Sequence, residues 1–170
     1  YIDNAWDANN GNILLHKTAQ YGGIGGTCYL KIVPDAVTYK DKEYPRLVAI
    51  DPVLMTIDTE PEDIDSVNRY TMRFVVSGPQ GEIARKEVTE KVVTETGIVT
   101  GWKVSDWYSS QLTGGRWTLD KEYDWPYDFA PIVHWQNLPQ AGSPYGRSDV
   151  LDIIELQDRI NFIASNISKI

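Results

Sequence analysis

The stretch NLPQAGSPYGRSDVLDIIELQDRIN, residues 137–161, combines a rigid turn with the start of a helix. Its first ten residues hold Pro139, Gly142, Pro144 and Gly146. A glycine-rich turn ahead of a helix can bind a phosphate group, or it can fix the angle at which a structural helix leaves a sheet. Features in the rest of the sequence decide between these two interpretations.

The segment after this turn has the clearest helical pattern in the chain. Ser148 is the predicted N-cap, and Asp149 and Asp152 lie where the helix dipole is positive. An apolar stripe repeats at helical spacing and comprises Val150, Ile153, Ile154, Ile160, Ile163 and Ile167. Polar residues on its flanks can contact neighbouring chains or water; they are Gln157, Asp158, Asn161 and Asn166. The sequence therefore predicts a C-terminal amphipathic helix.

Residues 1–26 are predicted to form a helix that ends in a glycine turn. A loose helical period runs over residues 3–20 and is interrupted by NNGN at residues 9–12. Gly22, Gly23, Gly25 and Gly26 then end the helix and lead into a strand. Phosphate-binding glycine loops have the opposite order, and the Gly-x-x-x-x-Gly-Lys-Ser/Thr pattern is absent. We therefore expect no phosphate site here.

Residues 27–136 are predicted to be β-rich. Short segments rich in Val, Ile, Thr, Tyr and Trp partly alternate in period two, at residues 27–33, 46–50, 69–77, 87–95, 101–110, 116–125 and 130–135. Turn signals separate them at Pro52, residues 78–81, Gly97 and residues 114–115. The acidic residues 58–65, DTEPEDID, are predicted to be a solvated loop with a short helical turn, because they lack the glycine and final Glu of a calcium loop.

Together these segments predict an α+β fold: an N-terminal helix, an antiparallel β-rich middle and a C-terminal amphipathic helix. The parts 1–26, 27–136 and 137–170 make one domain, since 170 residues suffice for one core. The chain starts at Tyr1 without Met and stops while the helical pattern continues, so we expect an internal piece of a longer protein. No window approaches the roughly 20 apolar residues of a membrane helix. The single cysteine, Cys28, excludes an internal disulfide and favours a reducing or indifferent compartment.

We predict no enzyme, no metal site and no cofactor. His16 and His134 are the only histidines, and no known catalytic motif surrounds them. His134 lies in a predicted strand beside the proline-rich turn, where a hydrogen-bonded structural role is favoured over that of a general base. The formal net charge of −8 opposes a tight grip on nucleic-acid phosphates.

Aromatic residues gather in the second half of the β-rich region: Trp102, Trp107, Tyr108, Trp117, Tyr123, Trp125, Tyr127, Phe129 and Trp135. A β-sandwich presenting such rings on one face could stack sugars, which makes a glycan-binding module one functional hypothesis. The other is a twisted sheet that uses large rings for its core and for a subunit interface. We favour the second hypothesis, in which these rings belong to the core or to a subunit interface.

Residues 130–161, APIVHWQNLPQAGSPYGRSDVLDIIELQDRIN, resemble the portal proteins of long-tailed bacteriophages. That family runs from a strand through an Asn-x-Pro turn and a glycine-containing spacer to Gly-x-Ser-Asp and a helix with Leu-Gln-Asp-x-x-Asn. The matching residues here are Pro131, Val133, Asn137, Pro139, Gly146, Ser148, Asp149, Leu156, Gln157, Asp158 and Asn161. Residues 6–33 resemble the helix, glycine and strand that precede the β-rich part of the same family.

The resemblance implies a structural protein without ATPase chemistry of its own. Portal subunits form a ring, usually dodecameric in the virion, at one capsid vertex. Double-stranded DNA is packaged and ejected through the ring without sequence specificity. Terminase, head-completion or adaptor proteins, and capsid or scaffold proteins are the implied partners. The implied locations are the virion and, during assembly, the bacterial cytoplasm. This chain would be the wing, and its proline and glycine residues would set the angle between sheet and helix.

Overall fold

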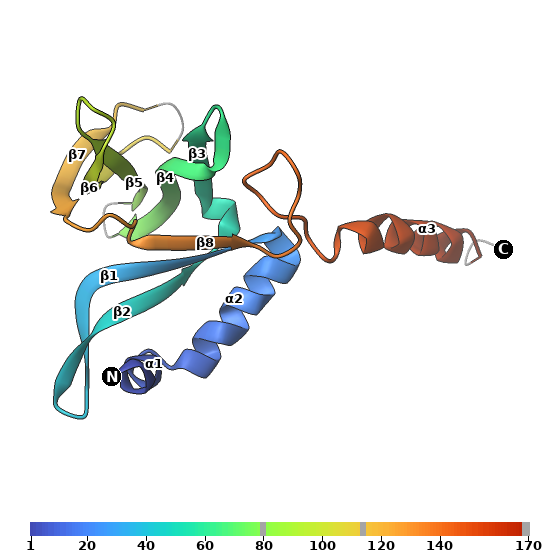
Figure 1. Ribbon diagram of the computed structural model, residues 1–170. Coiled ribbons are helices and arrows are strands. Elements are labelled where there is room, and N and C mark those ends of the chain that lie inside the picture. Colours follow the sequence, from blue (N-terminus) through green and yellow to red (C-terminus); the bar gives the residue numbers. More distant parts are fainter. Residues whose placement is uncertain (79–80, 113–114, 168–170) are drawn as a thin grey trace.

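The computed structural model describes residues 1–78, 81–112 and 115–167, and it confirms the predicted α+β fold (Figure 1). The elements in chain order are α1 (Ile2–Ala8), α2 (Gly11–Gly25), β1 (Thr27–Tyr39), β2 (Lys42–Ile50), the 3-10 turn η1 (Pro52–Leu54), β3 (Met55–Glu60), β4 (Asp63–Gly78), β5 (Gly81–Val93), β6 (Val99–Ser109), β7 (Thr118–Trp125), β8 (Ile132–Gln136) and α3 (Leu151–Ile167). Parts of the predicted turns at 78–81 and 114–115, and the last residues of the predicted helix, lie outside the described residues.

The strands form two antiparallel sheets. Five strands follow one another in the order β3-β4-β5-β6-β7, as expected for a chain of hairpins. The other sheet has the order β2-β1-β8, so its central strand pairs with a neighbour in sequence on one side and with a distant strand on the other. In that distant pair Cys28 lies opposite Trp135.

The core lies between the two sheets. Its buried members are Tyr29, Ile50, Met55, Ile57, Val67, Tyr70, Trp102, Ala130 and Ile132. Successive side chains of β1 point to opposite faces of the smaller sheet. Tyr29 belongs to this core, whereas Cys28 points toward α2, where its Sγ donates to the carbonyl of Thr18. A buried ion pair between Lys31 of β1 and Glu87 of β5 also joins the two sheets.

Helix α2 covers the outer face of the smaller sheet. Three of its four buried residues, Leu14, Thr18 and Gly22, are spaced four apart and share one side of the helix. Gly26 is the C-cap, with a φ of 80° and its N–H bonded to the carbonyl of Gly22. The predicted glycine turn is therefore shorter than expected, because Gly22, Gly23 and Gly25 are still helical.

The β-rich region differs from the prediction in three places. Residues 58–65 are not a loop with a helical turn but the end of β3, a tight turn and the start of β4; Asp58 pairs with Arg69 across this hairpin. Strand β3 itself was missed. The β1–β2 hairpin is also longer than predicted, because Lys40 and Asp41 adopt positive φ angles of 50° and 59° and close the turn without a glycine.

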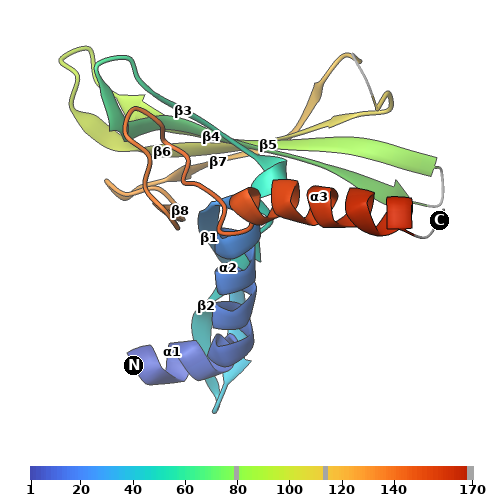
Figure 2. The same ribbon diagram turned by 90° about the vertical axis from the view of Figure 1, so that its right-hand side faces the viewer.

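Helix α3 projects away from both sheets, and Figures 1 and 2 show it from two directions. None of its residues from Leu151 to Ile167 is buried. No helix in the part of the chain that the structure describes is long and apolar enough to cross a membrane.

Candidate functional site

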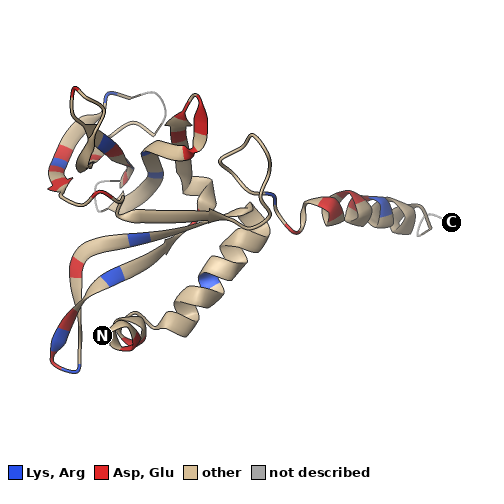
Figure 3. Cartoon of the chain, in the orientation of Figure 1, with Lys and Arg blue, Asp and Glu red and all other residues tan. Residues whose placement is uncertain are grey.

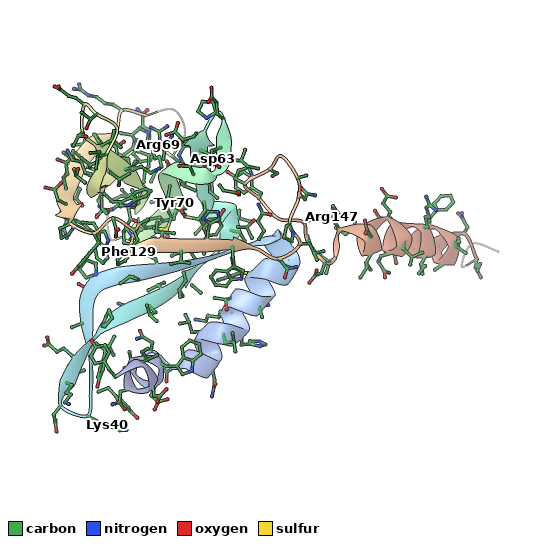
Figure 4. All side chains as sticks on the ribbon, viewed as in Figure 1. Lys40, Asp63, Arg69, Tyr70, Phe129 and Arg147 are labelled. Carbon is green, nitrogen blue, oxygen red and sulfur yellow. The ribbon has the colours of Figure 1, made fainter. Side chains whose placement is uncertain are left out.

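The residues of the opening stretch meet the end of α2 at one place, which we call the α2–α3 junction. It consists of Gly22, Gly23, Gly26 and Thr27 at the end of α2 and the start of β1, and of Asn137, Gly146, Ser148 and Asp149 between β8 and α3. Figure 4 labels Arg147, which lies at this place in the chain.

Two glycines let two backbones touch in the junction. A Cβ added to Gly146 would lie 2.1 Å from the carbonyl oxygen of Gly26, and one added to Gly26 would lie 2.3 Å from the carbonyl oxygen of Gly146. The approach is held by two hydrogen bonds, from the Asn137 N–H to the Gly26 carbonyl at 2.9 Å and from the Gly146 N–H to the Thr27 hydroxyl at 3.0 Å. Gly146 is therefore required by space, not by its φ angle.

The carbonyl of Gly23 ties the start of α3 to the end of α2. It belongs to the last turn of α2, where carbonyls lack a helical partner. The Asp149 N–H donates to it at 2.9 Å and the Ser148 hydroxyl at 3.0 Å. The prediction that Ser148 is the N-cap was wrong: α3 begins at Leu151, and the Ser148 Oγ accepts only from the Val150 N–H, at 3.2 Å.

Asn137 closes the loop that precedes α3. Its side-chain amide donates to the Asp149 carboxylate at 2.8 Å. Next to it, Leu138 and Arg147 form an isolated antiparallel bridge, with the Arg147 N–H donating to the Leu138 carbonyl at 2.8 Å. Residues 139–146 are thus a closed loop with both ends fixed.

The structure brings together four of the nine residues that sequence analysis singled out: Asn137, Gly146, Ser148 and Asp149. The others lie apart from the junction. Pro139 is exposed in the closed loop, and Leu156, Gln157, Asp158 and Asn161 are exposed on α3, where the Gln157 amide donates to the Asn161 side chain at 3.0 Å.

Sequence analysis missed Tyr145, which fastens the closed loop to the larger sheet. Its hydroxyl accepts a hydrogen bond from the Ile57 N–H of β3 at 2.9 Å, and its ring packs against the core. A tyrosine between a proline and a glycine has no periodic pattern around it, so nothing in the sequence pointed to this contact.

The phosphate interpretation of the turn finds no support in the geometry. The backbone N–H groups of Gly146, Arg147 and Asp149 all donate within the protein, as described above. Acidic side chains also gather on the first turns of α3 and on the β3–β4 hairpin (Figure 3). Within residues 1–78, 81–112 and 115–167 no group of three or more His, Cys, Asp and Glu could hold a metal ion.

His134 makes the structural hydrogen bond that sequence analysis expected. Its Nδ1 lies 2.9 Å from the hydroxyl of Tyr70, and its ring stacks on Tyr29 with the ring centroids 6.0 Å apart. Burial lowers the pKa of His134 below its usual value of 6.5, and the nearby Asp65 only partly opposes this. The neutral imidazole is therefore the form that the fold favours.

The free energy of unfolding should fall on acidification because of His134. Below about pH 6.5 the imidazole of the unfolded chain binds a proton, whereas that of the folded chain stays neutral because its pKa is lower. The stability that is present above this pH is therefore lost as the pH falls toward the pKa of the folded state. The loss is about 1.4 kcal/mol for each pH unit by which the folded-state pKa is lowered. Urea unfolding from about pH 8 to about pH 5 measures this. His134→Asn should flatten the profile. An unchanged slope in that variant, or an equal flattening in His16→Gln at an exposed position, would contradict the prediction.

The aromatic residues do not form the single face that a sugar platform along the sheet would need. Trp102 is in the core, whereas Trp107 and Trp117 lie beside Lys86, whose ammonium is 5.1 Å and 4.8 Å from their ring centroids. Burial, with Arg73 and Arg69 nearby, lowers the pKa of Lys86.

A separate aromatic cluster lies between β7 and β8. It consists of Trp125, Tyr127 and Phe129; Figure 4 labels Phe129. The rings of Tyr127 and Phe129 stack with centroids 5.3 Å apart, and the Trp125 indole donates to the Phe129 carbonyl at 2.9 Å. Tyr127 and Phe129 are 52% and 51% exposed, so their rings are open to a ligand or to a neighbouring chain.

Comparison with protein-family models found no match to the chain, and comparison of its sequence with curated proteins found none either.

Proposed function

We propose that this chain is the wing part of a bacteriophage portal subunit, a structural element of the ring through which double-stranded DNA is packaged and ejected. The observation that carries the proposal is the α2–α3 junction. Asn137, Gly146, Ser148 and Asp149, which belong to the family resemblance, hydrogen-bond to one another or to residues at the end of α2 and the start of β1. Four of the nine residues singled out thus lie in one hydrogen-bonded junction, which sets the direction of α3.

Two further features agree with the proposal. The formal net charge is −8, and a wall with a net negative charge repels DNA phosphates enough to let a duplex slide without being trapped. Helix α3 exposes apolar side chains along its whole length, as a subunit of an assembly does before it meets its neighbours. On this proposal the partners are further copies of the chain, terminase, head-completion or adaptor proteins, and capsid or scaffold proteins.

The test uses the chain extended at both ends to its natural termini. Light scattering should give the mass of a ring, and negative-stain images of the same sample should show rings of about a dozen subunits with a central hole. Gly146→Val and Ser148→Leu should impair folding or ring assembly, whereas Pro139→Ala, in the exposed part of the closed loop, should leave rings intact. A monomer without rings, or unchanged assembly of both junction variants, would count against a portal.

A glycan-binding module is the second candidate, and the exposed, stacked pair of Tyr127 and Phe129 beside Trp125 favours it. Sugars stack on such rings through their apolar faces. Added oligosaccharides should then shift the tryptophan fluorescence of the wild-type chain, and Tyr127→Ala should abolish the shift. The same shift in Tyr127→Ala, or none in the wild type, would argue against this module.

A further inference from the structure

A cleft of about 370 Å³ lies between strands β4, β5 and β6 of the larger sheet and the segment that leads into β8. Its volume is within the range of roughly 300–1,000 Å³ that is usual for small-molecule sites. Figure 4 labels Tyr70 and Phe129, which line the cleft from β4 and from the segment before β8. The lining combines apolar side chains with a few polar ones, as binding sites for small molecules do.

The ammonium group of Lys91 lies in this cleft without an anionic partner. Its Nζ donates to the Ser66 hydroxyl at 3.1 Å and lies 5.9 Å from the ring centroid of Trp102, which is opposite Lys91 in the register of β5 and β6. All three residues line the cleft. Within the described residues Lys91 forms no ion pair. An anion that enters the cleft therefore finds a cation that is already held in place.

The charge that fits is that of a monoanion. Asp65 lines the same cleft, close enough to His134 to act on the pKa of that imidazole. One ammonium balances one carboxylate, whereas a phosphate monoester carries about −1.5 to −2 at pH 7 and would bring excess negative charge toward Asp65. The Asp65 carboxylate is exposed and only accepts hydrogen bonds, so it favours a ligand that also has hydroxyl groups.

An aromatic surface lies at the edge of the cleft. Phe129 lines the cleft and is 51% exposed, and its ring stacks on that of Tyr127. Such rings bind the apolar face of a sugar. A ligand that covers Phe129 and also reaches Lys91 therefore has a ring with an apolar face, hydroxyl groups and one carboxylate.

We propose that this cleft binds a sugar that carries a carboxylate, of the uronic or sialic acid type. The carboxylate pairs with Lys91 and accepts from the Ser66 hydroxyl, the sugar hydroxyls donate to Asp65, and the apolar face of the ring packs on Phe129. The inference goes beyond the portal function. It rests on the second candidate, the glycan-binding module, whose class of ligand it names.

Calorimetric titration of the extended chain with two matched pairs of sugars tests the inference. The pairs are digalacturonic acid with its dimethyl ester, and sialyllactose with lactose. At least one acid should bind, and its neutral counterpart should bind more than about tenfold more weakly, because a hydrogen bond to a charged group is lost. The affinity for the acid should also fall as salt is added.

Two lysine variants show whether Lys91 is the cation. Lys91→Met keeps most of the apolar stem that packs on Trp102 and should lose more than about tenfold in affinity for the acid. Lys103→Met is the matched control: it removes the same charge from the next strand, but Lys103 pairs with Glu122 outside the cleft, so the affinity should not change. Phe129→Ala should weaken both members of each pair.

The inference is overturned if neither acid binds, if an acid and its neutral counterpart bind equally well, or if Lys91→Met binds as the wild type does. An equal loss in Lys103→Met would assign the effect to overall charge and would overturn it too. Neutral oligosaccharides that bind with dependence on Tyr127 but not on Lys91 would leave the glycan-binding module standing without this ligand class. The images of rings test the portal function separately.

Discussion

Replacing Gly146 by alanine should destabilise the fold by about 3 kcal/mol, because a methyl group has no room there. The new Cβ would lie 2.1 Å from the carbonyl oxygen of Gly26, and both atoms belong to backbones that are fixed by hydrogen bonds. Backbone cannot move aside as a flexible side chain does, so the junction has to open. Urea unfolding of the purified variant measures the loss.

Gly142 supplies the control for this substitution. It lies in the same closed loop and has a φ of 76°, but nothing lies within 4 Å of an added Cβ. Gly142→Ala should therefore cost only the backbone strain of a left-handed residue, about 1–2 kcal/mol. Equal losses in Gly142→Ala and Gly146→Ala would mean that backbone freedom, and not contact between the chains, explains the glycine at position 146.

Removing the Glu87 carboxylate should lower the free energy of unfolding by about 3–5 kcal/mol, since Lys31 would be left charged and buried. The side chains of Lys31 and Glu87 are only 9% and 10% exposed, and the pair joins the two sheets at the core. Glu87→Ala should show the full loss in urea unfolding. The double variant Lys31→Met with Glu87→Leu should recover most of it, because two apolar side chains of similar volume need no partner.

The surface pair of Lys103 and Glu122 is the comparison for the buried one. Its nitrogen and oxygen atoms are 3.7 Å apart, and its side chains are 38% and 45% exposed. Glu122→Ala should change stability by less than about 1 kcal/mol. If Glu87→Ala is as mild as that, or if the double variant is no more stable than Glu87→Ala, burial of the charges is not the reason for the effect.

Sequence analysis predicted the class of fold because local signals agreed with it. Alternation of Val, Ile, Tyr and Thr marked most strands, and the period of the isoleucines marked α3. The prediction of strands failed where the composition of a segment suggested a loop although its side chains alternate as in a strand. In residues 58–65 the acidic residues suggested a loop, yet Asp58 finds Arg69 on the neighbouring strand and the hairpin continues through them.

The junction was only partly predictable. The glycines, Asn137 and Ser148 could be singled out, but not their partners, because Gly23 and Thr27 lie more than a hundred residues earlier in the chain. Ser148 fits the N-cap pattern, and the free carbonyl at the end of α2 takes its hydroxyl instead. No periodic signal exists for such a contact between the ends of two elements.

The strand order also determines when the parts of the molecule can form. The larger sheet is built from consecutive hairpins, so its contacts are local and can form early. Strand β8 joins β1 only after a loop of about 100 residues has closed, and the α2–α3 junction follows β8. We expect a transition state in which the larger sheet is structured and the junction is open, so that Gly146→Ala accelerates unfolding and leaves the folding rate nearly unchanged in a chevron plot. During synthesis, α3 would then take up its direction last, after the two sheets have met.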